Sequence, residues 1–311
     1  CRDAGANFEL FVFDILSEVG CTRGLTSPCV HFHKSRAVRL FHWGDDFVLL
    51  GKRSQCSWIS ERLGKRLMVK NRGLLGPRKT DLREISILHR TLTWYPAGSP
   101  GGERVTYCAD PRHAEVLRIQ CGMDSPTARP VVTPAEKIAA TPDKLQALSN
   151  TDAPGFKSGA MRAGYLSLDR PDLQYGPKES ARGLSLPTVR HGDMLKRLTR
   201  YLIGAPNLLW VYKRQRFPKE VQVWSDTDWA GCVRTRRSTS GGCIMAGSHT
   251  IKGWSSTQAG LALSSGEAEY YGVVRAAGLG LGQQALSREG GSCCPYESGR
   301  TVRPPWARQG A

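Results

Sequence analysis

The chain has 311 residues and is strongly basic, with 44 lysine and arginine residues against 27 aspartate and glutamate residues and a formal net charge of +17. This length suffices for two or three domains, and a hydrophobic content of 40% suffices for their cores. The charge favours nucleic acid as the partner. A membrane partner is not expected, because the sequence holds no apolar run of about 18 residues and no long basic amphipathic helix.

Ten cysteines are scattered along the chain without a Cys-x-x-Cys pair among them. Such scatter indicates reduced thiols in an intracellular protein rather than disulfide bonds or a zinc site. No secretory signal is visible, and the first residue is Cys1 rather than Met. We therefore expect a protein that is not secreted and a chain that is cut from something longer.

The first predicted elements are a helix and two strands. Residues 7–19 carry a helical stripe of apolar side chains that ends at Gly20, and strands follow at residues 29–32 and 37–41. His31 and His33 share one face of the first strand, which would suit a metal ion. Because no cysteine or carboxylate cluster accompanies them, we expect histidines whose nitrogen atoms have hydrogen-bond partners instead.

Two adjacent carboxylates, Asp45 and Asp46, follow in the sequence FHWGDDFVLLG of residues 41–51. Strand-forming residues lie on both sides, so we expect the two acids in the tight turn of a β-hairpin. Adjacent aspartates repel each other, and a bound cation relieves that repulsion. Mg²⁺ is the cation that best suits these oxygen ligands. The alternative is an ordinary turn, because Gly and Asp are common turn residues.

The segment after the hairpin is basic. The predicted elements are an amphipathic helix at residues 57–63, a basic strand at 65–70, strands at 85–88 and 92–94, and a helix that starts at Asp110. Six basic side chains are candidates for contacts with nucleic-acid phosphates. They are Lys65, Arg66, Lys70, Arg72, Arg78 and Lys79. For each of them the alternative is a solvated charged face.

The middle of the chain changes in composition. Residues 124–155 are rich in Pro, Thr, Ala and Ser, which is typical of a linker. The sequence YLSLDRPDLQ of residues 165–174 predicts a helix that stops at Arg170 and restarts at Asp172. Residues 194–202 then predict a basic amphipathic helix.

A second set of acids lies in the last third of the chain. Residues 221–231 predict an alternating strand that carries Asp226 near its end. Residues 238–246 and 250–255 predict the next strands of an antiparallel meander. A long helix then opens with the sequence LSSGEAEYY of residues 263–271.

The two acids of this helix are assigned different roles. Glu267 has the spacing of a capping box with Ser264, so we expect it to satisfy free backbone N–H groups at the helix start. Glu269 lies one turn before Val273 and so on the core-facing side, where an unpaired carboxylate is costly. We therefore assign Glu269 and Asp226 to a Mg²⁺ site. Asp228 is expected to belong to the turn or to the surroundings of that site.

These motifs resemble the reverse transcriptase and ribonuclease H of Ty1/copia retrotransposon polyproteins. The acidic hairpin is similar to the reverse transcriptase hairpin, although Trp43 and Gly44 stand where a tyrosine and an apolar residue are more usual. The turn VGCTRG at residues 19–24 is similar to the turn ahead of that hairpin. The ribonuclease H resemblance is carried by WSDTDWAG at residues 224–231, RRSTSG at 236–241 and LSSGEAEYY at 263–271.

The resemblance implies an α+β fold class, in which a partial reverse transcriptase palm and thumb precede a connection and an incomplete ribonuclease H-like α/β domain. The implied divisions are palm and thumb at residues 1–123, a linker at 124–155, connection helices at 156–217, the ribonuclease H-like domain at 218–290 and a disordered basic tail at 291–311.

The resemblance also implies an RNA-directed DNA polymerase with a ribonuclease H, in which Asp45, Asp46, Asp226 and Glu269 are catalytic and hold Mg²⁺, with Mn²⁺ as a substitute. The implied partners are an RNA/DNA template-primer, an RNA–DNA hybrid and deoxynucleotides. The implied location is a cytoplasmic particle or the nucleus.

Further aspartates of the family, ahead of the hairpin and after the last helix, have no counterpart here. We therefore expect this chain alone to be inactive; the alternatives are a nucleic-acid-binding remnant and a decayed reading frame.

Overall fold

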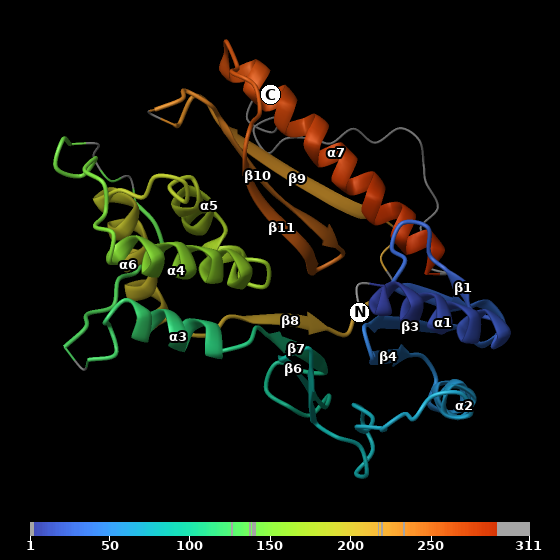
Figure 1. Ribbon diagram of the computed structural model, residues 1–311. Helices are drawn as coiled ribbons and strands as arrows, with labels where there is room; N and C mark the ends of the chain where they lie inside the picture. The colour runs from blue at the N-terminus through green and yellow to red at the C-terminus, as the bar shows by residue number, and fades with distance from the viewer. Residues whose placement is uncertain are drawn as a thin grey trace.

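The computed structural model describes residues 3–125, 127–136, 138, 141–216, 218, 220–232 and 234–290. Helices and antiparallel sheets alternate along these residues, and three sheets are each joined to helices (Figure 1). None of the described helices combines the length and the apolar character that a membrane crossing requires. The basic tail predicted at residues 291–311 lies outside the described residues.

The first unit is a four-stranded antiparallel sheet with the order β1-β2-β3-β4, packed against two helices. Its core joins α1, β3 and α2 through the buried side chains of Ile15, Leu40 and Ile59. The apolar stripe predicted for the first helix is confirmed, because its buried members face this core. The elements are α1 (Ala4–Glu18), β1 (Thr22–Arg23), β2 (Val30–His33), the 3₁₀ helix η1 (Lys34–Arg36), β3 (Val38–Trp43), β4 (Asp46–Leu50) and α2 (Arg53–Gly64).

The basic strand predicted at residues 65–70 is wrong. These residues follow the end of α2 as a turn and an irregular segment, and all except Leu67 are exposed. Leu67 packs against the first core, while the charged side chains around it remain in solvent. A strand needs the edge of a neighbouring strand as the hydrogen-bond partner of its backbone N–H and C=O groups. Here the charged side chains keep most of residues 65–70 in solvent, away from the edge of any described strand.

The second unit combines another four-stranded antiparallel sheet, β5-β6-β7-β8, with a group of helices. Strand β8 was not predicted, and it pairs with β7 from Arg104↔Lys213 to Cys108↔Leu209. The helices share one core that includes Leu117, Leu166 and Leu198. The elements are β5 (Glu84–Ile87), β6 (Arg90–Tyr95), β7 (Arg104–Cys108), α3 (Arg112–Gln120), α4 (Asp152–Leu166), the 3₁₀ helix η2 (Pro171–Leu173), α5 (Tyr175–Ala181), α6 (Val189–Gly204) and β8 (Leu209–Lys213).

The second core crosses the divisions that the sequence predicted. It joins α3, expected in the palm and thumb part, to α4, η2 and α6, expected in the connection. Helix α4 begins at Asp152, within the predicted linker 124–155, and ends at Leu166, ahead of the predicted stop at Arg170. The linker itself lies along α6, because Arg197 pairs with Glu136 at 2.6 Å. Short polar segments of this kind are held by contacts with distant residues, which composition does not record.

The third unit is a three-stranded antiparallel sheet with the order β11-β10-β9, covered by the long helix α7 (Figure 1). The predicted meander is confirmed, and its register places Asp226 opposite Gly241. Helix α7 lies close to β9, since a Cβ atom at Gly272 would collide with the hydroxyl of Thr227. The elements are β9 (Val221–Asp228), β10 (Thr239–Ala246), β11 (His249–Thr257) and α7 (Ser265–Glu289).

Polar contacts join the three units. The Gln174 side chain donates to the carbonyl of Gly253 at 2.9 Å, which links the second unit to β11. At its far end, α7 reaches the loop between β1 and β2 (Figure 1), where the Glu289 carboxylate accepts hydrogen bonds from the backbone N–H of Thr26 at 3.0 Å and from its hydroxyl at 2.7 Å. The last helix therefore contacts the first unit as well as its own sheet.

Candidate functional site

The predicted acidic hairpin is present between β3 and β4. Its last pair is Trp43↔Asp46, which leaves Gly44 and Asp45 as a two-residue turn. Gly44 has a φ of +58°, whereas Asp45 is not among the residues with positive φ. This pattern is that of a type II′ turn, in which glycine is favoured at the first turn position. Gly44 is therefore suited to the turn, and Asp45 is exposed while Asp46 is half-buried.

Among the described residues, the two aspartates have one ion-pair partner, Arg72. An Arg72 Nη2 atom lies 4.0 Å from Asp46 Oδ1, and the side chains of Arg72 and Asp46 are 70% and 42% exposed. An exposed pair of this kind contributes little to stability. Within the described ranges, no group of three or more His, Cys, Asp or Glu side chains is arranged to hold a metal ion. The hairpin thus offers two carboxylates.

The predicted histidine face contains a third member that the sequence did not indicate, His42 on β3. His31 and His42 are both buried, and their ring centroids lie 5.2 Å apart. Neither ring nitrogen of His31 has a hydrogen-bond partner among the described residues. The expectation of partnered histidines is therefore wrong for His31, while the Nδ1 atom of His33 lies 3.4 Å from the Ser35 hydroxyl. Burial and, to a smaller extent, the nearby His42 and Arg23 lower the pKa of His31 to about 4.

Asp226 and Glu269 were assigned to one site from the sequence, and the charge of Asp226 acts on Glu269. Asp226 lies on β9, and Glu269 lies in the first part of α7, which packs on that strand. Burial raises the pKa of Glu269 above its ordinary value, and the negative charge of Asp226 raises it further. A backbone hydrogen bond from Thr227 acts in the opposite direction. The charge of Asp226 thus acts on Glu269, although Asp226 is exposed and Glu269 is partly buried.

The neighbouring acids have the structural roles that the sequence predicted. The Ser264 hydroxyl caps α7 by accepting a hydrogen bond from the Glu267 backbone N–H at 3.1 Å. The Glu267 carboxylate accepts from the Leu263 backbone N–H at 2.7 Å, one residue before the expected partner. Asp228 accepts a hydrogen bond from the backbone N–H of Thr239 on the facing strand. Both carboxylates are engaged locally, whereas no ion pair to Asp226 or Glu269 is found in the part of the chain that the structure describes.

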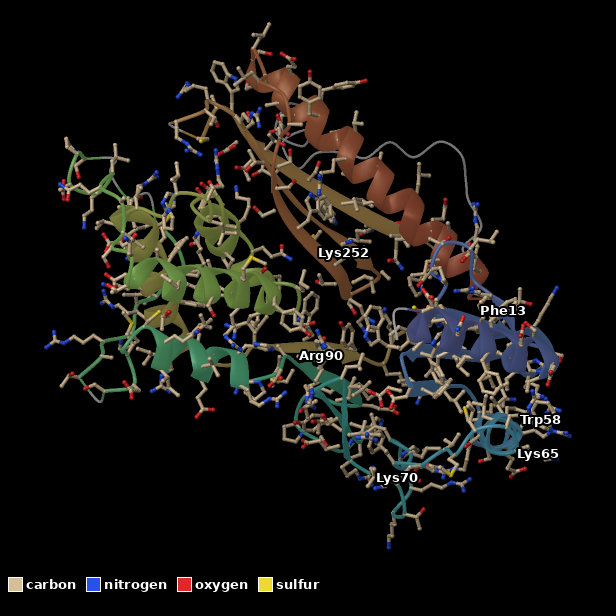
Figure 2. All side chains as sticks on the ribbon, viewed as in Figure 1. Phe13, Trp58, Lys65, Lys70, Arg90 and Lys252 are labelled. Carbon is tan, nitrogen blue, oxygen red and sulfur yellow. The ribbon has the colours of Figure 1, made fainter. Side chains whose placement is uncertain are left out.

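The six basic candidates lie in the exposed segment after α2. Figure 2 shows Lys65 beside α2 and Lys70 farther along the chain that leaves it. Arg66 pairs with Glu18 at 2.7 Å, and Arg72 is the neighbour of Asp46 described above. All six side chains are exposed, and so they are accessible to a polyanion: Lys65, Arg66, Lys70, Arg72, Arg78 and Lys79. No contact of theirs distinguishes a phosphate-binding role from a solvated face.

The amino-acid sequence of the chain is similar to those of several known proteins. The chain is 32% identical over 189 residues to the uncharacterized mitochondrial protein AtMg00810 of Arabidopsis thaliana, a match that covers 59% of this chain and 75% of that protein. It is also 35% identical over 151 residues to the retrovirus-related Pol polyproteins from transposons RE2 and RE1 of Arabidopsis thaliana. The chain belongs to the same family as AtMg00810 and is related to retrotransposon Pol polyproteins.

The two Pol polyproteins are much longer than the matched region. Each match covers 48% of this Pol-related chain and 10% of the polyprotein. The chain therefore spans about a tenth of their length. No family model matches the chain. No solved structure matches it.

The repulsion between the two carboxylates of the Pol-related chain leads to a first prediction. Asp226→Asn should lower the pKa of Glu269, because it removes the neighbouring negative charge while the burial remains. A titration of the glutamate side-chain carboxyl resonances by NMR measures this change. Asp228→Asn is the matched control, because Asp228 is not a source of the shift, and it should leave the pKa unchanged. An unchanged Glu269 pKa in Asp226→Asn would show that the two acids are not coupled.

Proposed function

We propose that this chain is a portion of an RNA-directed DNA polymerase with a ribonuclease H-like domain, of the Ty1/copia class. The relationship to transposon Pol polyproteins supports the proposal, and so do two pairs of carboxylates at the motifs where the resemblance expects them. In the whole parent protein, the hairpin acids would serve the extension of a primer on a template. Asp226 and Glu269 would serve the hydrolysis of the RNA strand in the hybrid.

The effect of the Asp226 charge on the partly buried Glu269 is the observation that carries the proposal. A carboxylate whose pKa is raised by burial and by a second carboxylate is stabilised in its charged form by a nearby cation. Mg²⁺ prefers oxygen ligands and is commonly held by one or two carboxylates together with water and substrate phosphates. The two side chains therefore fit Mg²⁺ as a pair of ligands. When bound, the ion supplies activation of water and charge stabilisation at the leaving oxygen.

The hairpin offers a second pair of oxygen ligands. Asp45 projects from the turn, and Asp46 opens β4, so both are held by strands that pair on either side. They would hold Mg²⁺ while a primer hydroxyl attacks a deoxynucleotide, a reaction that depends on positioning and charge neutralisation. The exposed basic segment that contains Lys65 and Lys70 would contact the phosphates of the template-primer.

We expect neither reaction to run efficiently in the chain as it stands. Two-metal chemistry needs more carboxylates than a single pair, and the described residues form no group of three or more side chains that could hold a metal ion. Binding of a hybrid duplex does not need them, because it depends on the basic surface. The second candidate function is therefore nucleic-acid binding without catalysis, which the net charge of +17 favours.

The proposed cation site is tested by metal titration. Adding Mg²⁺ should lower the pKa of Glu269 in the parent chain, because the ion stabilises the carboxylate form. The same addition should have a much smaller effect in Asp226→Asn, while Asp228→Asn should respond as the parent does. If Mg²⁺ leaves the Glu269 pKa unchanged in the parent chain, the two residues do not form a cation site.

The catalytic part of the proposal needs a labelled RNA–DNA hybrid. We expect tight, salt-sensitive binding that Asp226→Asn does not weaken in the absence of Mg²⁺, and little cleavage when Mg²⁺ is present. Fluorescence anisotropy measures the binding, and gel electrophoresis measures the cleavage. Efficient Mg²⁺-dependent cleavage that Asp226→Asn abolishes would contradict the expected inactivity. Binding that does not change with salt would contradict the role of the basic surface.

A further inference from the structure

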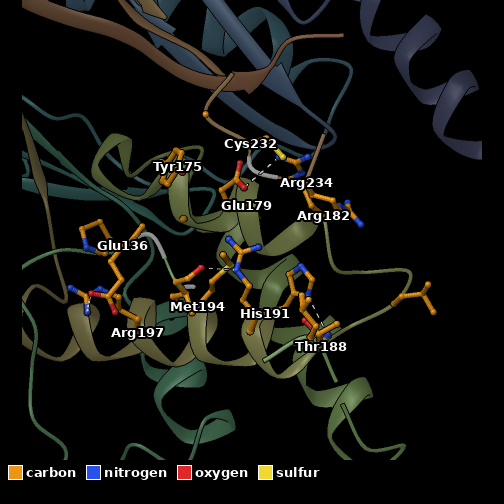
Figure 3. Close-up of a pocket in the computed structure, with 18 residues that line it drawn as sticks. Glu136, Tyr175, Glu179, Arg182, Thr188, His191, Met194, Arg197, Cys232 and Arg234 are labelled. Carbon is orange, nitrogen blue, oxygen red and sulfur yellow. Dashed lines mark hydrogen bonds and ion pairs between the residues drawn. The ribbon is translucent and has the colours of Figure 1, made fainter. Parts of the chain in front are cut away.

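A cavity of about 280 Å³ lies between the helices of the second unit and the loop that follows β9 (Figure 3). Its walls come from α5, from α6 and from two further sets of residues. The first set is Pro134, Ala135, Glu136, Ile138 and Leu145, and the second is Gly231, Cys232 and Arg234. None of the four candidate catalytic acids lines it. The cavity is therefore separate from the proposed catalytic sites.

The lining of this cavity has an excess of positive charge. Arg197 is neutralised by Glu136 at 2.6 Å, and Glu179 is shared between Lys178 at 2.7 Å and Arg182 at 3.5 Å. The Arg190 Nε atom donates to the carbonyl of Ile138 at 3.0 Å, which fixes the side chain without neutralising it.

Two guanidinium groups of the lining remain without a counter-charge. Arg190 and Arg234 have no carboxylate within ion-pair distance among the residues that the structure describes. Figure 3 shows Arg182 and Arg234 at the same end of the cavity, beside Cys232. This end can accept an anion without first breaking an ion pair at Arg234.

His191 adds a neutral hydrogen-bond donor to the same wall. Its Nδ1 atom accepts a hydrogen bond from the Thr188 backbone N–H at 3.2 Å, so the ring proton resides on Nε2. Burial lowers the pKa of His191, and the guanidinium groups of Arg190, Arg234 and Arg182 lower it further. Glu179 acts on the ring in the opposite direction, so three positive charges and one negative charge act on this part of the cavity.

The remaining walls are apolar. They include the ring of Tyr175 and the side chains of Met194, Leu145 and Leu186. Figure 3 shows Tyr175 across the cavity from Arg182 and Arg234. Small-ligand sites commonly combine an apolar lining with a few polar groups that orient the ligand. A ligand that suits both parts has an anionic group at one end and a flat ring at the other.

We propose that this cavity binds a mononucleotide, with its phosphate at Arg190, Arg234 and the Nε2 atom of His191 and with its base against Tyr175. Arginine suits phosphate because its planar group presents several N–H donors. The aromatic ring offers a stacking surface that every base can use. The site requires neither of the proposed reactions and adds a nucleotide-binding property to the second unit.

The phosphate could come from a free nucleotide or from the end of a nucleic-acid strand, and the experiment separates the two sources. The probes are AMP, adenosine, inorganic phosphate and an oligonucleotide with or without a 5′-phosphate, each added to the full chain. Isothermal titration calorimetry measures affinity. Alkylation of Cys232, quantified by peptide mass spectrometry, reports occupancy of the cavity, with Cys243 on β10 as the internal reference.

Cys232 is suited to this use. Burial opposes ionisation of its thiol, but hydrogen bonds from Thr235 and Arg182 outweigh burial and lower its pKa. A thiolate reacts faster with alkylating reagents than a thiol does. Burial raises the pKa of Cys243, so the reference should react slowly.

We expect AMP to bind and to slow the alkylation of Cys232, and adenosine and inorganic phosphate to bind more weakly than AMP. Arg234→Gln should weaken AMP binding by about tenfold or more, because a hydrogen bond to a charged group is lost. Arg234 is exposed, so this variant should fold as the parent does. Arg275→Gln, which removes an exposed arginine from α7, is the matched control and should bind AMP as the parent does.

Three results would overturn the proposal. One is the absence of AMP binding at millimolar concentration. Another is an equal loss of affinity in Arg234→Gln and Arg275→Gln, which would indicate non-specific attraction to a basic chain. The third is protection of Cys232 by the 5′-phosphorylated oligonucleotide but not by AMP, which would assign the cavity to strand ends instead of free nucleotides.

Discussion

Replacing Asp172 with Ala should lower the free energy of unfolding by about 3–5 kcal/mol, because it leaves a buried guanidinium without its counter-charge. The Arg170 side chain is 1% exposed and pairs with both Asp172 oxygens, at 3.0 and 2.8 Å. Arg170 also donates to the carbonyls of Ala205 and Pro206, each at 2.9 Å. The Arg170 side chain thus links η2 to the segment that follows α6.

Urea unfolding of the full chain, followed by circular dichroism at a helical wavelength, measures this loss. The matched control is Asp193→Ala in the same unit. Asp193 pairs with Lys144 at 2.5 Å, but the two side chains are 31% and 36% exposed, so its loss should cost at most about 1 kcal/mol. Equal losses in the two variants would mean that burial of Arg170 does not strengthen its dependence on Asp172.

Lowering the pH from 7 toward 4 should destabilise the first unit by up to about 3 kcal/mol through His31 alone. The pKa of His31 is about 4 in the folded chain, against an ordinary value of 6.5. Between these values the unfolded chain binds the proton and the folded chain does not. Stability is therefore fully present above pH 6.5 and decreases as the pH falls toward 4. His42, whose pKa is also lowered by burial, acts in the same direction.

The pH dependence is measured by urea unfolding at a series of pH values, with the His31 ring resonances followed by NMR. His31→Leu should reduce the pH dependence, and at pH 7 it should not destabilise the unit, because it removes two unpaired buried nitrogens. Leu40→Val is the control, since Leu40 lies opposite His31 in the sheet and its change leaves both histidines in place. If His31→Leu retains the full pH dependence, another group is responsible.

The local features of the fold could be predicted from the sequence. The hairpin at Asp45 and the cap at Ser264 depend on residues adjacent in the chain, so turn and capping preferences identify them. The assignment of Glu269 to the core-facing side of α7 followed from helical periodicity, and the burial that raises its pKa agrees with it. The identity of the units with a palm or a ribonuclease H fold stays a prediction.

The features that were missed depend on partners far apart in the chain. Strand β8 is short and is positioned by pairing with β7, from which four α-helices and the 3₁₀ helix η2 separate it among the described residues. The core that joins Leu117 to Leu198 crosses a segment that composition marks as a linker. His42 could have been noticed, because it lies two residues after Leu40 and so on the same strand face. Contacts of this range are set by tertiary packing and not by local preference.

The contact between Glu289 and Thr26 has a consequence for how the chain unfolds. An acidic side chain at a helix C-terminus lies next to the negative end of the helix dipole, which by itself promotes fraying of the final turn. Two donors from Thr26 offset that repulsion only while the β1–β2 loop keeps its native position. The stability of the final turn of α7 therefore depends on a contact with residues near the N-terminus. Melting of the first unit should release it, and amide hydrogen exchange in these two distant segments should rise together.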